Sequence, residues 1–227
     1  MFNPMKNLIS ALSLATALLV ATPVLAADGG KVKKAKKAKT AKAVAAPAAE
    51  TLPVNPQASK VEWFATKVTG KHNGTVLLKS GTMETTGGRL TGGTFVIDMT
   101  SIKVLDLTDA DYNAKLTGHL NSDDFFSVEK NPTSTFTITS IAPIKKAEAG
   151  KPNYTVNGDL TIKGITNRIT FPATVTVSGG KVTAVGAITV DRSKFDVKYG
   201  SNSFFDNLGD KAISNDMIFN VNVVAQK

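Results

Sequence analysis

The sequence lacks cysteine altogether and has only two histidines, His72 and His119, among its 227 residues. Without cysteine, no disulfide framework, thiolate metal site or lipid-modified N-terminal cysteine can form. The two histidines lie far apart in the chain, and no HExxH or paired-histidine spacing occurs. The sequence therefore predicts no metal site and no cofactor.

Signals of catalysis are equally scarce. No GxSxG motif occurs, and Ser127–Lys130 matches the SxxK pattern without the SDN and KTG motifs that accompany it in β-lactamases. His72 lies in an expected loop and His119 near the end of an expected helix, where structural or surface roles suffice. We therefore expect a protein that is not an enzyme. A lipid-modifying enzyme is the least favoured of three hypotheses, and the other two are given at the end of this subsection.

Residues 1–26 have the pattern of a secretory signal peptide. Lys6 supplies the positive charge, residues 8–20 form an apolar segment, and Val24-Leu25-Ala26 is a small-residue cleavage site. The alternative is a membrane anchor, but 13 residues are fewer than the roughly 20 that a spanning helix needs. The sequence thus predicts cleavage and a periplasmic or secreted location.

Residues 27–58 are rich in Lys, Ala and Pro and predict a disordered linker, because they bury too little apolar area to offset chain entropy. Seven lysines between Lys31 and Lys42 either contact an anionic envelope surface or belong to a solvated spacer. Residues 1–57 hold eight Lys and two acids, so residues 58–227 keep only +3 of the total charge of +9. This balance argues against a nucleic-acid partner.

Residues 59–227 predict one all-β domain. Turn residues at Asn73-Gly74, Gly87-Gly88, Gly164 and Gly179-Gly180 separate segments in which apolar and polar residues alternate, as in half-buried strands. These segments are 60–69, 75–78, 82–86, 90–99, 133–139, 154–162, 165–177, 181–190 and 213–224. About eight strands with short connections favour an antiparallel barrel or a sandwich, and closure into a barrel would leave no exposed edge.

One stretch, residues 107–120, has the period of a helix. Thr108 is the expected N-cap, and Leu116 and Leu120 lie on one face of the helix together with Tyr112. Phe125-Phe126 follows as a short apolar plug. We therefore expect one short helix that connects two strands, and the sequence does not indicate whether it acts as a lid.

Four motifs carry a family resemblance: DMTSI (98–102), GHLNSDDFFSVEKNPTSTF (118–136), GDLTIKGITNRITFP (158–172) and DRSKFDV (191–197). In this order they resemble the YceI-like family of exported, lipocalin-like polyisoprenoid-binding proteins. The two middle motifs are long and specific, whereas Asp196 stands where the family usually has glycine. The resemblance covers the chain from about Lys60 to the C-terminus. It implies an eight-stranded antiparallel lipocalin-like barrel with an additional helix, holding a long apolar chain inside.

Alternation also predicts which side chains would line such an interior. They are Phe95, Ile97, Phe136, Ile138, Leu160, Ile162, Phe171, Ala184, Gly186, Ile188, Phe219 and Val221, with Ala173 and Ala187 as further small residues. Small inward residues leave room for a ligand, unless they simply pack against large ones. Arg192, beside Asp191, is a candidate for holding a polar headgroup at the barrel mouth; the alternative is a structural ion pair between neighbouring strands.

Two functions remain open at this point. The first is an exported protein that carries or sequesters a polyisoprenoid or similar long-chain amphiphilic lipid inside the barrel. The second is a structural or partner-binding envelope protein whose barrel is filled, and which makes contacts through the Lys-rich linker or the loop containing Phe204-Phe205.

Overall fold

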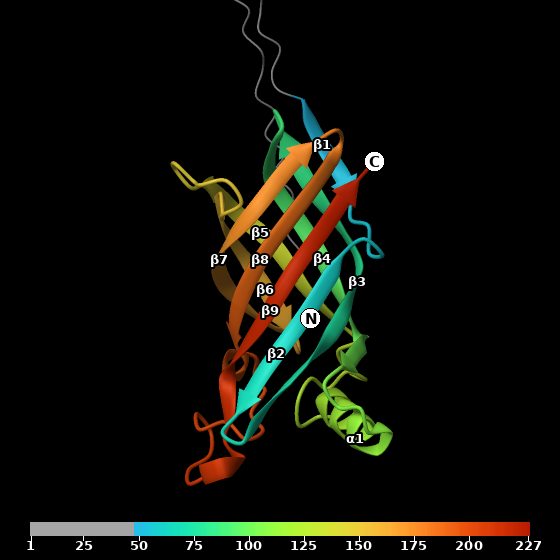
Figure 1. Cartoon of the computed structure of the whole chain (residues 1–227), viewed down its shortest axis with the longest axis vertical. Coiled ribbons are helices and arrows are strands. Elements are labelled where there is room, and N and C mark those ends of the chain that lie inside the picture. Colours follow the sequence, from blue (N-terminus) through green and yellow to red (C-terminus); the bar gives the residue numbers. More distant parts are fainter. Residues whose placement is uncertain (1–47) are drawn as a thin grey trace, which may run out of the picture. The chain divides into compact units, whose positions relative to one another are not determined.

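The computed structural model describes residues 48–227, which form a closed antiparallel β-barrel with one α-helix (Figure 1). The strands are β1 (Ala49–Pro53), β2 (Lys60–Lys67), β3 (Gly70–Thr86), β4 (Arg89–Val104), β5 (Thr133–Pro143), β6 (Tyr154–Ile162), β7 (Ile165–Ser178), β8 (Lys181–Asp191) and β9 (Ile213–Gln226). Helix α1 (Ala110–Asn121) connects β4 to β5, and two 3-10 helices, η1 (Arg192–Phe195) and η2 (Gly209–Lys211), lie between β8 and β9. The predicted signal peptide and most of the predicted linker lie outside the described residues.

The barrel wall consists of strands β2 to β9. Each of them pairs antiparallel with the next along the chain, and pairing of β9 with β2 closes the sheet. The predicted eight-stranded antiparallel barrel with one connecting helix is confirmed for the part of the chain that the structure describes. Closure gives every wall strand two hydrogen-bonded neighbours, so the wall has no open edge.

Strand β1 was not predicted, because Ala49–Pro53 belongs by composition to the Pro- and Ala-rich linker. It pairs with the far end of β3, from Ala49↔Thr86 to Pro53↔Thr82, and Val54 then bridges Ala225 of β9. β1 thus continues the course of β2 between β3 and β9. Leu52 of β1 is 1% exposed, and its burial contributes roughly 1.5–3 kcal/mol. The boundary expected at residue 58 was therefore too late for this segment.

Of two turns predicted from local sequence, one is present in the structure and the other is not. The hairpin expected over residues 158–172 is present as β6 and β7, and its two-residue turn places Lys163 and Gly164 at φ 51° and 73°, as a type I′ turn requires. The turn expected at Asn73-Gly74 is wrong, because both residues lie inside β3. A Cβ on Gly74 would overlap the carbonyl oxygen of Lys103 and approach the Trp63 indole to 2.6 Å. Gly74 is thus a packing glycine.

Helix α1 begins two residues after the predicted N-cap. The carboxylate of Asp109, rather than Thr108, accepts hydrogen bonds from the backbone N–H groups of Asp111 and Tyr112, at 3.0 Å each. A carboxylate also stabilises a helix N-terminus electrostatically, which a threonine hydroxyl does not. Leu120 is buried as expected, but Tyr112 is exposed. No helix within residues 48–227 is long and apolar enough to cross a membrane.

The two ends of the barrel differ. Helix α1 and the β8–β9 loop (residues 192–212) lie at one end, whereas β1 and the C-terminus lie at the other (Figure 1). The Phe125 ring lies 5.6 Å from that of Tyr199 in this loop, so the plug belongs to the same end. We call the end with α1 and the β8–β9 loop the mouth. Phe125 and Phe126 are each 7% exposed, so the plug predicted from the sequence packs into this end.

Candidate functional site

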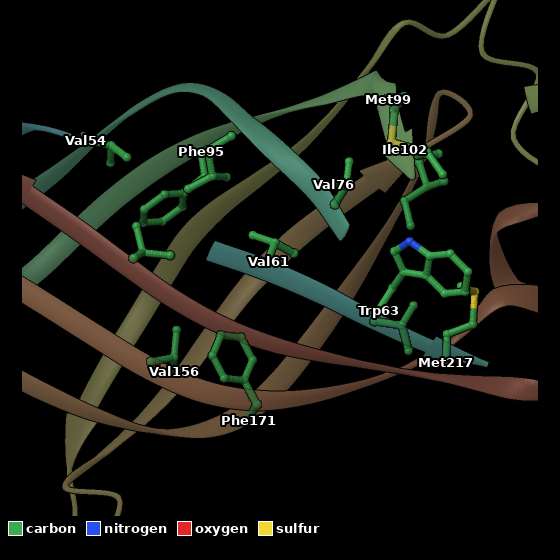
Figure 2. Close-up of a cluster of buried hydrophobic side chains, with 14 of the residues drawn as sticks. Val54, Val61, Trp63, Val76, Phe95, Met99, Ile102, Val156, Phe171 and Met217 are labelled. Carbon is green, nitrogen blue, oxygen red and sulfur yellow. The ribbon is translucent and has the colours of Figure 1, made fainter. Parts of the chain in front are cut away.

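The barrel encloses an apolar cavity of about 190 Å³. Every wall strand from β2 to β9 contributes lining side chains, and Leu120 of α1 and the plug residues Phe125 and Phe126 complete it at the mouth. Figure 2 shows Trp63, Phe95 and Phe171 among the side chains in the barrel interior. The cavity is a consequence of barrel closure, since one face of each strand points inward.

All twelve residues that the sequence predicts as lining do line this cavity: Phe95, Ile97, Phe136, Ile138, Leu160, Ile162, Phe171, Ala184, Gly186, Ile188, Phe219 and Val221. Ala173 lines it as well, whereas Ala187 is exposed on the outer face, because it is one residue out of step with the inward positions of β8. Trp63 also lines the cavity and was not predicted, although Val61, Trp63 and Ala65 alternate inward along β2. Met99 and Met217 line it without having been predicted as well.

Three phenylalanine rings form a cluster inside the cavity. The rings of Phe95 and Phe136 stack with centroids 6.1 Å apart, and the Phe136 and Phe171 rings lie 5.7 Å apart at 48°. The Phe136 ring occupies the space where Gly158 lacks a side chain, since a Cβ there would overlap it. Aromatic side chains from β4, β5 and β7 therefore limit the free volume.

Arg192 is the only charged side chain among the residues that line the cavity, and it is 2% exposed. Its guanidinium donates to the carbonyl oxygens of Ser214 (2.9 Å), Val197 (2.9 Å) and Ile213 (3.1 Å). Burial lowers the pKa of Arg192, and the nearby Asp191 partly counteracts this effect. Arg192 thus fastens the β8–β9 loop across the mouth through three of its five N–H donors.

The Asp191 carboxylate forms hydrogen bonds with Ser193 and not the ion pair that was the alternative prediction. It accepts hydrogen bonds from the backbone N–H of Ser193 (3.0 Å) and from the Ser193 hydroxyl (2.6 Å), and so caps η1. Asp196, at the position where the resembling family usually has glycine, adopts a left-handed conformation with φ 58°. The local turn is thus kept without glycine, because Asp tolerates this region better than most residues.

One buried donor remains without a partner. The indole Nε1 of Trp63, a residue 4% exposed, makes no hydrogen bond within residues 48–227. Trp63 lines the cavity near the mouth beside Met217 (Figure 2). Leaving a buried donor unpaired costs about 1–3 kcal/mol, so a ligand oxygen that reached it would gain stabilisation.

The two histidines each pair with a carboxylate away from the cavity. His72 Nδ1 lies 2.8 Å from Asp106 Oδ2, and His119 Nε2 lies 3.1 Å from Asp124 Oδ2. Burial raises the pKa of Asp106, but hydrogen bonds from the Asn73 N–H and from His72 outweigh this, so the pKa lies below its ordinary value. In the described part of the chain, no group of three or more His, Cys, Asp and Glu could hold a metal ion.

Comparison with known proteins places these features in a family context. Residues 53–225 match the YceI-like domain. A UPF0312 protein of Photorhabdus laumondii is 31% identical over 109 residues, which are 48% of this chain and 53% of that protein. A UPF0312 protein of Yersinia enterocolitica is 38% identical over 77 residues, or 34% of this chain and 37% of the relative. The alignments thus span about half or less of these curated relatives.

Solved structures share the fold over a longer range. BcnA of Burkholderia cenocepacia superposes with a TM-score of 0.55 at 26% identity, covering 76% of this chain and 99% of that one. A polyisoprenoid-binding domain of Saccharophagus degradans, implicated in plant cell wall breakdown, gives a TM-score of 0.55 at 16% identity, covering 79% of this chain and 98% of its own. At that identity the second likeness shows the fold alone.

Proposed function

The chain belongs to the YceI-like family, and on this premise we propose that it carries or sequesters a polyisoprenoid or similar long-chain amphiphilic lipid inside its barrel. The observation that carries the proposal is the apolar cavity that all eight wall strands line. The polyisoprenoid-binding domain from Saccharophagus degradans shares this fold, which supports the same ligand class here.

The size of the cavity defines what binding requires. An engineered cavity of about 150 Å³ holds one benzene, so about 190 Å³ accommodates only a short segment of a lipid chain. A longer chain enters when the rings of Phe95, Phe136 and Phe171 rotate toward the wall. Each methylene that is buried contributes about 0.8 kcal/mol, so several prenyl units supply well over about 10 kcal/mol before ordering costs.

We assign the headgroup end of the ligand to the mouth. Arg192 has two N–H donors beyond the three that bind the carbonyl oxygens of Val197 in the loop and of Ile213 and Ser214 in β9, and these two are suited to an oxygen-rich headgroup. Its neighbours at the mouth are apolar: the Phe125 ring centroid lies 5.8 Å from the guanidinium carbon. In such surroundings a charge-assisted hydrogen bond is strong.

The proposal includes export and a surface contact, both from the sequence. The signal-peptide pattern of residues 1–26 favours a periplasmic or secreted protein, and the seven lysines between Lys31 and Lys42 favour contact with an anionic envelope surface. Binding and release of the lipid require no catalytic group, and we assign none.

A second function rests on one observation. The cavity of about 190 Å³ is smaller than the roughly 300–1,000 Å³ of most ligand pockets. A barrel filled by its own side chains would instead serve as a structural or partner-binding envelope protein. In that case, deletion of Lys31–Lys42 abolishes envelope association while the barrel stays intact.

Native mass spectrometry of the mature protein, expressed with its own N-terminal residues, separates the two functions. A carrier shows a discrete added mass that organic extraction releases as an isoprenoid or another long-chain lipid. A mass that equals that of the polypeptide, and that incubation with geranylgeraniol leaves unchanged, contradicts the carrier function and supports the filled barrel.

A further inference from the structure

Large hydrophobic side chains are exposed mainly at the mouth. On its β8–β9 side these are Val68 in the β2–β3 turn, Ile165 after the β6–β7 turn, and Tyr199, Phe204 and Phe205 in the β8–β9 loop. Val68 is 65% exposed and Phe205 49%. At the opposite end of the barrel, Ile144 is 36% exposed, whereas Leu52 and Met83 are almost completely buried. The exposed apolar groups are thus concentrated where the chain covers the barrel interior.

Hydrogen bonds join these segments into one surface. The backbone N–H of Val68 donates to the carbonyl oxygen of Ala212 (3.1 Å), and Lys163 Nζ donates to the carbonyl oxygen of Asp196 (2.8 Å). The β8–β9 loop therefore connects the β2–β3 turn with the β6–β7 turn. We call the surface formed by residues 67–71, 163–165 and 194–211 the mouth surface.

The mouth surface is basic as well as apolar. It contains six lysines and three aspartates, at 67, 71, 163, 194, 198 and 211 and at 196, 206 and 210, a net charge of +3. Residues 48–227 as a whole carry 19 basic and 17 acidic residues, a net charge of +2. All of the excess positive charge in the described part of the chain therefore lies on this surface.

Lysine and aromatic side chains are close together on this surface. Lys198 Nζ lies 5.4 Å from the centroid of the Phe204 ring and 2.8 Å from Asp196 Oδ1. Lysines with long apolar stems beside exposed aromatic rings are typical of surfaces that enter the headgroup region of a bilayer. The α1 side of the mouth also has a lysine beside an exposed ring, since Lys115 Nζ lies 5.4 Å from the centroid of the Tyr112 ring. It differs in charge, because residues 105–130 contain six acidic residues and two lysines.

We propose that the mouth surface docks on the headgroup region of a bilayer that contains anionic phospholipid. This inference rests on the proposed function, because a long-chain lipid has to leave a bilayer before it can enter the barrel. The rings of Phe204 and Phe205 enter the interface, and the lysines contact phosphate groups. The β8–β9 side faces the membrane, whereas the acidic α1 side is turned away from it.

Docking at this surface places the cavity next to the lipid source. Tyr199 of the mouth surface packs against His119 and Phe125, with ring centroids 4.4 and 5.6 Å away. Phe125 in turn lines the cavity. A displacement of Tyr199 toward the bilayer would therefore loosen the cover of the barrel at the point of docking.

The test uses the mature protein, without the predicted signal peptide of residues 1–26, in which the seven lysines between Lys31 and Lys42 are replaced by glutamine. Neither segment then contributes to binding. Co-sedimentation is measured with vesicles of phosphatidylcholine and phosphatidylglycerol and with vesicles of phosphatidylcholine alone. We expect binding to the anionic vesicles that salt weakens. The double variant Phe204→Ser/Phe205→Ser should reduce the partition constant at least tenfold. The matched control is Leu77→Ser/Ile218→Ser, which removes two exposed apolar side chains from the barrel wall.

Each outcome has one meaning. Absence of vesicle binding by the parent, or an equal loss in the control variant, overturns the proposal. If the parent protein dimerises instead of binding vesicles, and Phe204→Ser/Phe205→Ser abolishes the dimer, a second copy covers the mouth surface. That result also overturns the proposal. Native mass spectrometry of the same proteins reports separately on lipid in the barrel, so vesicle binding without a retained lipid would contradict the carrier function and leave the docking surface standing.

Discussion

Substitution of Gly186 by phenylalanine tests whether the barrel interior is the ligand site. Gly186 is in β8 and lines the cavity; a Cβ built on it would lie 3.6 Å from the Phe171 ring and 3.3 Å from the carbonyl oxygen of Pro172. A new side chain would therefore project into the cavity beside Phe171. Because a cavity of about 150 Å³ holds one benzene, a benzyl group takes up most of the 190 Å³ that is free.

The magnitude follows from the ligand carbons that the benzyl group displaces. About six carbons lose their place, and at about 0.8 kcal/mol each the loss is about 5 kcal/mol. This loss raises the dissociation constant by on the order of 10³-fold or more. Overpacking lowers the free energy of unfolding by about 1–3 kcal/mol, so a folded barrel is expected. The measurement is displacement of N-phenyl-1-naphthylamine by geranylgeraniol, followed by fluorescence.

Ala187→Phe is the matched control, because Ala187 is the next residue of β8 and is exposed on the outer face. It adds a similar ring without changing the interior, and we expect its affinity to equal that of the wild type. Phe171→Ala should weaken binding less than about tenfold, since the contacts are spread over many residues. If Gly186→Phe melts cooperatively and still binds geranylgeraniol normally, the pocket lies elsewhere.

Three further predictions concern the frame of the site. Gly74→Ala should lower the free energy of unfolding, measured by urea denaturation, by about 1–3 kcal/mol. The control Gly70→Ala should have little effect, because its Cβ would meet only the end of the Lys67 side chain, at 3.7 Å. Equal effects of the two substitutions would refute the packing role of Gly74. Arg192→Met leaves three carbonyl oxygens without their donor and should destabilise the fold by about 3 kcal/mol or more. In Arg192→Lys, the affinity for geranylgeranyl diphosphate should fall relative to the affinity for geranylgeraniol. An unchanged ratio of these two affinities argues against a headgroup role of Arg192. Because hydrogen bonds lower the pKa of Asp106 despite partial burial, its carboxylate stabilises the fold above its unfolded pKa of about 4, and this contribution disappears as the pH falls through the lower folded pKa. Thermal melting between about pH 5 and 2 should therefore show a steeper acid loss in the wild type than in Asp106→Asn, and parallel curves would contradict this.

The strands, and the face that each presents to the interior, follow from the local pattern of apolar and polar residues. A strand has a period of two residues, so an alternating pattern specifies the inward positions before any strand is paired. For this reason Phe95, Phe136, Phe171 and Gly186 could be assigned correctly. The prediction that Ala187 faces the interior is wrong. It rested on the small size of the side chain, whereas the residue is out of step with the alternating pattern.

Other features depend on contacts between distant parts of the chain and could not be predicted from local patterns. Gly74 lies within a strand because Trp63 of the neighbouring strand occupies the space of its side chain, and the local Asn-Gly pattern contains no information about that neighbour. Leu52 is buried because β1 pairs with β3 beyond the end of β2, and Val54 then bridges Ala225 of β9. Arg192 binds carbonyl groups that follow about twenty residues later in the chain. The chain thus specifies its strands locally, but the volume of the cavity, the cover of the mouth and the surface beside it are determined only when the barrel closes and its side chains pack.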